Sequence, residues 1–221
     1  TVEEVAAAAA RAGLAFVVFA DHGDATRTPD PPSYRSGVLC IDGVEISTAA
    51  GHYVAIGMRP SAYPLAGEAR DVVEDVARLG GFGVAAHPDS PRPALRWREW
   101  TAPFDAIEWL NCDSQWRDNS TLRLVHTFLK YFLRGPESLA SLFDRPDATL
   151  SRFDALARQR RVVALAGADA HARIELPNGG DPYQEGASLK IPSYESVFRT
   201  FAVRAQLDRP LTGRAVVDAI A

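Results

Sequence analysis

Cysteine is nearly absent from this sequence. Only Cys40 and Cys112 occur among the 221 residues, and they do not form a C-x-x-C pair. A disulfide framework and a thiolate zinc knuckle are therefore excluded. Because a free cysteine behaves as a small hydrophobic residue, we expect both thiols to be buried.

Long apolar runs and a surplus of positive charge are also missing. No apolar stretch approaches the ~20 residues that a membrane-spanning helix needs, so no membrane span is expected. The sequence has 24 Lys and Arg residues and 28 Asp and Glu residues, which gives a net charge of -4. Proteins that bind the phosphate backbone need a basic surplus, so no nucleic-acid partner is expected.

Three common catalytic signatures are missing as well. The sequence has no H-E-x-x-H of a zincin, no phosphate-binding P-loop and no G-x-S-x-G nucleophile turn. The apolar fraction of 47% is ordinary for a globular protein, and neither a repeat nor a change in composition marks a boundary. We therefore predict one domain over residues 1–221.

The regular elements that are present alternate between helices and short apolar strands. Thr1 and Glu4 form a capping box at the start of the first helix, and the continuously apolar strands are typical of a parallel sheet buried on both faces. Such alternation predicts an α/β fold with a parallel sheet, open or closed into a barrel. The helix-to-strand units are 1–14 to 15–20, 69–81 to 82–86, and 150–160 to 162–168.

Further elements are predicted between and around these units. Strands are expected at 37–47, 52–57 and 104–110, and a helix at 119–133. The Pro- and Gly-containing stretches 24–36 and 172–193 are predicted to be long connections, which in compact domains are usually functional or mobile.

Side chains that can bind a metal or move a proton follow the apolar strands. Because ligands gather at the carboxyl ends of strands in parallel α/β folds, we expect one shared site there. Each residue alone would also fit an ordinary polar strand end. These residues are Asp21 and His22, His87, Asn111, and Asp169 and His171, joined by Glu45 and His52. The fifth histidine, His126, falls in the predicted helix 119–133 and is interpreted as a helix-face residue.

The chemistry of this set favours a metal-dependent hydrolase. Asp169 and His171 are two residues apart and would share a face if the strand geometry continued. Imidazole and carboxylate ligands without thiolate suit zinc, manganese or iron. A carboxylate such as Glu45 can bridge two cations, and a two-metal site favours hydrolysis of a phosphoryl or acyl ester.

The order of these motifs resembles a known family. The segments GLAFVVFADHGD, IDGVEISTAAGHYVAIG, GGFGVAAHPDSP, FDAIEWLN and LAGADAHA are similar to the PHP domain, the polymerase and histidinol phosphatase superfamily of metal-dependent hydrolases. The similarity is greatest to its CehA/McbA-like bacterial members. The resemblance implies a distorted seven-stranded (β/α) TIM-like barrel of PHP type that holds two or three divalent metal ions, Zn, Mn or Fe.

The resemblance also implies roles for individual residues. Glu45 would bridge the first and second metals, and His52 and His87 would complete the second. Asp169 would bind the first metal, and His22 with His171 would belong to the third. Asp21 and His171 are the catalytic candidates, with Asp21 beside His22 to orient its ring. Glu108 and Asn111 match a recurring strand pattern, and we expect them either to be structural or to contact the metal ligands rather than the metals.

One departure from the family pattern stands out. The family begins with an H-x-H strand before the helix that starts here at Thr1, and this sequence contains no H-x-H. We expect the barrel to be truncated at both ends, with that strand missing upstream. The alternative is a non-catalytic PHP-like binding domain whose metal site has decayed.

The expected substrate is an anionic small molecule. A phosphomonoester or phosphodiester is the first candidate, and a carboxyl or carbamate ester is the alternative. The side chains expected to bind it are Arg27 and Arg35 in the loop after the D-H motif, and Tyr183 and Lys190 in the loop 173–192, which is predicted to be a lid. The cellular location and the oligomeric state are left open by the sequence.

Overall fold

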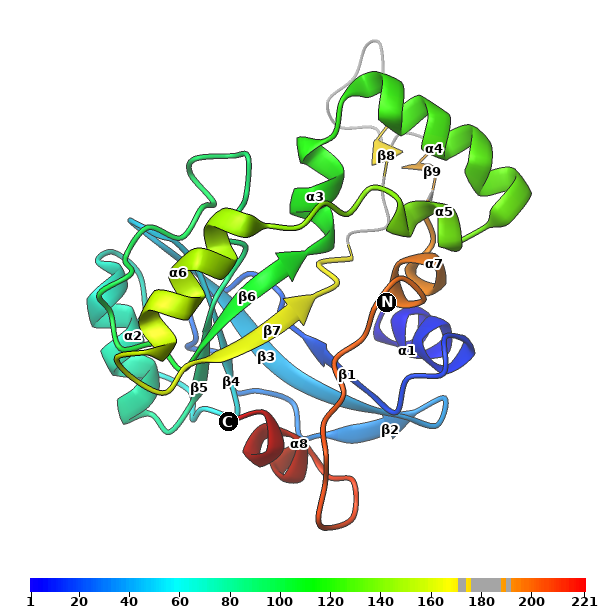
Figure 1. Ribbon diagram of the computed structural model, residues 1–221. Coiled ribbons are helices and arrows are strands. Elements are labelled where there is room, and N and C mark those ends of the chain that lie inside the picture. The colour runs from blue at the N-terminus through cyan, green and yellow to red at the C-terminus, as the bar shows by residue number, and fades with distance from the viewer. Residues whose placement is uncertain (171–173, 176–187, 190–191) are drawn as a thin grey trace, which may run out of the picture.

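A curled, mixed sheet of seven strands forms the centre of the protein. The computed structural model describes residues 1–170, 174–175, 188–189 and 192–221. The sheet runs in the order β1-β3-β4-β5-β6-β7, with β2 paired to the first half of β3, and it bends into a half-barrel (Figure 1). The strands are β1 (Phe16–Phe19), β2 (Ser33–Arg35), β3 (Val38–Thr48), β4 (Gly51–Ile56), β5 (Phe82–Ala85), β6 (Ala106–Asn111) and β7 (Val163–Gly167). The fold is therefore α/β, as predicted.

The prediction of a parallel sheet is wrong at β4. This strand is antiparallel to both neighbours, β3 and β5, whereas β1 with β3, β5 with β6, and β6 with β7 are parallel. The cause is a tight hairpin between β3 and β4, which turns at Gly51 with φ +116°. A side chain at Gly51 would overlap the backbone of Arg96, so this turn requires glycine.

The helices confirm most of the expected positions. Thr1 caps α1 by accepting a hydrogen bond from the Glu4 backbone N–H at 3.2 Å. The predicted connection 24–36 contains β2, and α3, which was not predicted, follows β6 directly. The helices are α1 (Val2–Arg11), α2 (Ala69–Arg78), α3 (Cys112–Asp118), α4 (Thr121–Arg134), α5 (Glu137–Ala140), α6 (Asp147–Ala157), α7 (Tyr194–Phe198) and α8 (Gly213–Ile220). A short pair, β8 (Ile174–Glu175) and β9 (Ser188–Leu189), completes the list. None of the described helices is long and apolar enough to cross a membrane.

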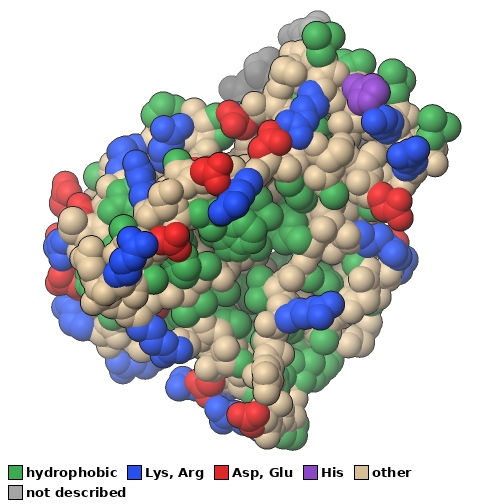
Figure 2. All heavy atoms as spheres, in the orientation of Figure 1, with side chains coloured by type: hydrophobic (Ala, Val, Ile, Leu, Met, Phe, Trp, Pro, Cys, Tyr) green, Lys and Arg blue, Asp and Glu red, His purple; other side chains and the backbone are tan. Residues whose placement is uncertain are grey.

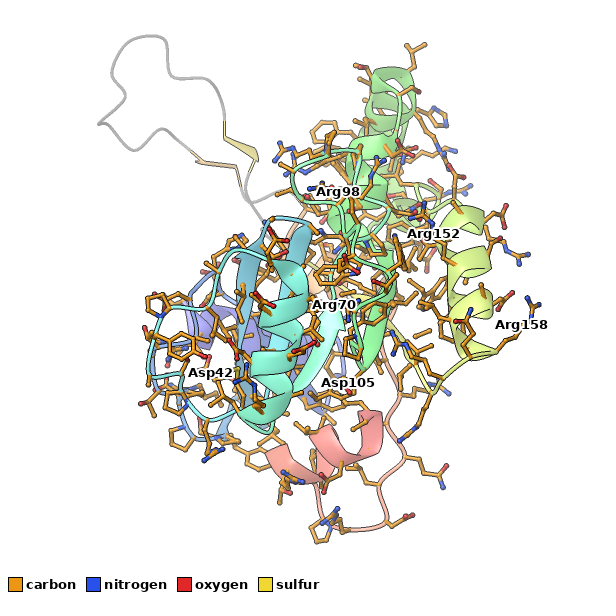
Figure 3. All side chains as sticks on the ribbon, turned by 90° about the vertical axis from the view of Figure 1, so that its left-hand side faces the viewer. Asp42, Arg70, Arg98, Asp105, Arg152 and Arg158 are labelled. Atoms are coloured by element: carbon orange, nitrogen blue, oxygen red, sulfur yellow. The ribbon has the colours of Figure 1, made fainter. Side chains whose placement is uncertain are left out.

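The convex face of the sheet carries one of the apolar clusters. There α2 presents Val72, Val73 and Val76 to Tyr53 of β4 and Ile107 of β6. The cluster also includes Trp97 and Phe104, which are fully buried and meet edge to face. In Figure 3, Arg70 lies on α2 and Arg152 on α6 at separate places on the outside of the sheet. This packing fixes the sheet from outside and leaves its concave face for other contacts.

The helix α8 covers one end of the concave face. Val216 and Ile220 of α8 pack against Leu39, Ile41 and Ile56 near the beginning of β3 and the end of β4. The opposite end, where β3 finishes and β4 starts, carries polar side chains instead. Alternation places these side chains on the same face, and their positions along β3 and β4 separate an apolar floor from a polar rim.

Candidate metal centre

Glu45 and His52 come from the hairpin of β3 and β4. Glu45 is paired in register with Val54, and His52 with Ser47, so the two side chains lie diagonally on the concave face. His52 Nδ1 lies 2.7 Å from Glu45 Oε1, and both residues are buried. Because β4 runs antiparallel to β3, a histidine at the start of β4 reaches the same edge as a glutamate late in β3. The antiparallel hairpin therefore supports the predicted site.

His22 reaches the same carboxylate from β1. The pairing of β1 with β3 resumes beyond Phe19 as a parallel bridge between His22 and Glu45. Two backbone hydrogen bonds hold it, from the Gly23 N–H to the Glu45 carbonyl and from the Glu45 N–H to the Asp21 carbonyl, each 3.0 Å. His22 Nδ1 is 3.9 Å from Glu45 Oε2, and 59% of its side chain is exposed. His22 thus lies on the solvent side of the cluster.

His87 completes the set of imidazoles around Glu45. It follows β5, and its Nε2 lies 2.9 Å from Glu45 Oε1. The rings of His22 and His52 are 5.1 Å apart, and those of His52 and His87 are 5.2 Å apart. Three histidines from three segments therefore surround one buried carboxylate.

The charges of this cluster are strongly coupled. Burial acts to raise the pKa of Glu45, but hydrogen bonds from His52 and His87 outweigh it and lower the pKa to about 2. Burial likewise opposes protonation of His87, yet the hydrogen bond to Glu45 and the nearby Glu108 carboxylate raise its pKa to about 8. The Glu45 carboxylate is therefore ionised near neutral pH and forms an ion pair with a protonated His87.

A second group of polar residues adjoins His87. The Asn111 amide donates one hydrogen bond to Glu108 Oε2 at 2.9 Å and another to Asp169 Oδ2 at 3.1 Å. Glu108 Oε2 also accepts a hydrogen bond of 2.7 Å from the His87 backbone N–H. Burial, and secondly the Asp169 charge, raise the pKa of Glu108 to about 7. Glu108 and Asn111 thus link His87 to Asp169.

The residues present fit a divalent metal ion. Ligand atoms of His22, Glu45 and His52 all lie within 4.8 Å of one another, so these three side chains can hold a metal. His87 Nδ1 is buried and has no hydrogen-bond partner among the described residues, although buried ring nitrogens are normally paired.

Two cavities meet this group. One has a volume of about 390 Å³ and is lined by Glu45, His87, Glu108 and Asp169 at one end and by apolar side chains such as Phe16 and Leu165 elsewhere. The other, of about 340 Å³, is lined by Asp21 and His22 together with Arg27 and Arg35. Asp21 lines both cavities, so the candidate centre lies between them.

The predicted alignment of Asp169 with His171 is not what the structure shows for Asp169. The strand β7 ends at Gly167, and Asp169 has φ +42°, which is far from extended geometry. Its carboxylate is instead directed by Asn111. The alignment was expected only if the strand continued, and this condition is not met at Asp169 because alternation holds only within a strand. His171 lies outside the described residues.

Of the four predicted substrate-binding residues, the structure describes two. Arg27 Nη2 lies 2.6 Å from Asp42 Oδ2, and Arg35 contacts Glu3, so both arginines already have carboxylate partners. Asp42 is labelled in Figure 3, on the outer side of the sheet. Tyr183, Lys190 and most of the predicted lid lie outside the described residues.

Two contacts in the site were not predicted from the sequence. Ser47 Oγ lies 3.5 Å from His52 Nε2, and the strand register that pairs these two residues is the signal that could have found it. The role of Glu108 depends on a backbone N–H 21 positions away, which no local pattern reveals.

Searches of the sequence against models of protein families and against curated proteins find no match.

Proposed function

We propose that this protein is a metal-dependent hydrolase of PHP type, with Glu45, His52 and His87 as its central ligands. One observation carries the proposal: three imidazoles converge on a single buried carboxylate at the rim of the half-barrel. Buried carboxylate and imidazole clusters at such a rim are typical of catalytic metal centres. His22, Asp169 and His171 are proposed as further ligands.

The residues of the chain hold and orient the reacting groups. A divalent metal bound here would lower the pKa of a coordinated water and polarise an ester oxygen. Glu45 fixes the relative positions of His52 and His87 through its two short contacts. Asp21, which is exposed and next to His22, is the proposed proton acceptor at the mouth of both cavities.

A phosphoester is the first proposed substrate. The cavity beside His22 contains Arg27 and Arg35, which can pair with a phosphate if their present partners Asp42 and Glu3 give way. A neutral carboxyl or carbamate ester is the second candidate. It is favoured by the apolar lining of the larger cavity, which suits an uncharged substituent.

The open side of the half-barrel borders the larger cavity. Among the described residues, β1 and β7 each pair with a single strand, which leaves one edge of each strand open. The larger cavity is lined by both edge strands. A neutral ester substrate would therefore lie along this open side, against the apolar lining of the larger cavity.

Metal analysis together with a substrate panel tests the proposal. After mild purification we expect at least one zinc, manganese or iron per chain and hydrolysis of an aryl phosphate, a phosphodiester or a carboxyl ester. Less than one metal per chain with no turnover after zinc or manganese is added would favour the non-catalytic binding domain. Activity confined to carboxyl esters would favour the second substrate.

The substitution Glu45→Gln separates ligation from folding. It keeps the shape of the side chain but removes its charge, so bound metal and kcat/KM should both fall by at least about 100-fold. The control His126→Ala alters an exposed helix-face histidine and should change neither by more than about twofold. Equal losses in both variants would show general destabilisation rather than ligation.

A further inference from the structure

The helix α4 presents an apolar surface to solvent. Six of its side chains are exposed, between 38% for Phe128 and 86% for Leu133. The six are Leu122, Val125, Phe128, Leu129, Phe132 and Leu133, and they are called the α4 crest below. Figure 2 shows hydrophobic side chains gathered along the outer edge of the molecule over α4.

The crest faces away from the other described parts of the protein. Thr127, on the opposite side of α4, is buried, and Tyr131 lies 2.5 Å from Ser196 of α7 through their hydroxyl oxygens. Arg123 anchors the beginning of the helix through Asp144 and the Ser141 carbonyl. The helix projects from the body in both orientations (Figures 1 and 3). The crest is thus held in place by a fixed opposite face.

The spacing of the crest is that of a helix pair. Leu122, Val125, Leu129 and Phe132 follow one another at intervals of three, four and three residues, which is the a/d pattern of a coiled-coil seam. The flanking positions 126, 128 and 133 are His, Phe and Leu, so no carboxylate or permanent cation borders the seam. Such a seam fits the same seam of another molecule without bringing like charges together.

The area of the crest is close to what a stable dimer needs. At roughly 100 Å² for each largely exposed side chain, the six present about 600 Å². Monomeric proteins rarely expose contiguous apolar patches beyond a few hundred Å². One side of a standard interface buries about 800 Å². The crest therefore provides most of one side of such an interface.

We propose that the α4 crest is a homodimer interface, in which α4 of one copy packs against α4 of a second copy. The same surface on both copies makes the contact self-complementary, as closed twofold symmetry requires. A lipid surface is the competing partner, since α4 contains Arg123, Lys130 and Arg134 and no acidic residue. The pairing of Arg123 with Asp144 leaves fewer cations for lipid headgroups, which favours the second copy.

Sedimentation equilibrium between about 1 and 200 µM tests this proposal. We expect wild type to dimerise in this range and the double variant Leu129→Glu, Phe132→Glu to remain monomeric. Val2→Glu, which alters an exposed apolar residue on α1, is the matched control and should dimerise like wild type. A wild type that stays monomeric throughout would overturn the proposal, as would a dimer that the double variant leaves intact.

Two further measurements keep the result interpretable. Phe128→Cys lies near the middle of the crest, and a short bis-maleimide should link two copies through it, because the natural Cys40 and Cys112 are buried. A failure to crosslink while wild type dimerises would place the interface elsewhere and contradict the proposal. Binding of a monomeric wild type to vesicles rich in phosphatidylserine, lost in the double variant, would assign the crest to a membrane surface instead.

Discussion

His87 and Asp169 both have backbone angles that side-chain-bearing residues seldom adopt, with φ values of +29° and +42°. Such positions cost on the order of 1–3 kcal/mol each and persist only where their surroundings enforce them. Here Glu108 accepts from the His87 backbone N–H, and Asn111 holds the Asp169 carboxylate. Two residues of β6 therefore maintain the strained backbone of two proposed ligands.

Gly167 tests this arrangement at the level of a single atom. A Cβ at this position would overlap Glu108 Oε1, so Gly167→Ala should displace Glu108 and destabilise the protein by about 2 kcal/mol. It should also weaken metal binding at least tenfold, because His87 loses its backbone partner. Urea unfolding and a competitive zinc titration measure the two effects.

A double-mutant cycle supplies the control for Gly167. Glu108→Ala removes the atoms that the new methyl group would meet, so the double variant should be less destabilised than the sum of the two single variants. Strict additivity would mean that Gly167 does not act through Glu108.

Cys112 gives a prediction about pH. Burial, followed by the nearby carboxylates of Asp113 and Asp169, raises the pKa of this thiol to about 12. Only the thiolate reacts with alkylating agents. The native protein should therefore react with iodoacetamide at least about 100-fold more slowly than glutathione at pH 8.5, and the rate should keep rising about tenfold per pH unit up to pH 11. Mass spectrometry of Cys112 after timed quenching measures this, and a rate that levels off near pH 9 would contradict it.

At the level of elements, Asn111 serves a helix and the candidate site at the same time. Its Oδ1 caps α3 by accepting from the Ser114 backbone N–H at 2.8 Å, while its Nδ2 serves Glu108 and Asp169. A strand that ends directly at a helix cap leaves no loop, and so the position of this amide is set by both β6 and α3.

Asn111→Asp should separate the two functions of this amide. The carboxylate keeps the cap but removes the donor and adds a charge beside two carboxylates. We expect a loss of about 2 kcal/mol in unfolding free energy and at least tenfold weaker metal binding.

Asn119→Asp is the matched control. Its amide donates to the carbonyls of Gln115 and Leu142, at 2.6 and 2.9 Å, on the far side of α3. Stability should fall by a similar amount, with metal affinity unchanged. Equal loss of metal affinity in both variants would mean that Asn111 acts only through folding.

Element positions were largely predictable from the sequence. The caps and apolar spacing placed α1, α2, α4 and α6 within a few residues, since these signals are local. The direction of β4 was not predictable from its apolar run, because periodicity reports burial and not the sense of pairing. The 11-residue length of β3 and the turn at Gly51 were the available signs of a hairpin.

At the level of the whole molecule, the gathering of the site was predictable and its internal geometry was not. His22 and His87 follow strands of the same direction, and the antiparallel β4 brings His52 from its beginning to the same edge, so the three histidines gather around Glu45 as expected. The exposed crest of α4 was not predicted, because an amphipathic pattern does not say whether the apolar side finds a partner within the same chain.

Metal binding should stabilise the whole protein, because a ligand that binds only the folded state shifts the unfolding equilibrium. At a free metal concentration 100 times Kd the gain is about 2.7 kcal/mol, which for a domain of this size corresponds to a rise in Tm of about 5 to 10 °C. Chelation should lower the Tm of the purified protein, and zinc, manganese or iron should restore it.

Glu45→Gln and His52→Ala should abolish the rise because both remove atoms of the three-residue cluster. The double variant Leu129→Glu, Phe132→Glu should retain it, since the crest lies on α4 and contributes no ligand. An equal rise in wild type and Glu45→Gln would locate the stabilising metal elsewhere, and differential scanning calorimetry at fixed protein concentration distinguishes the two results.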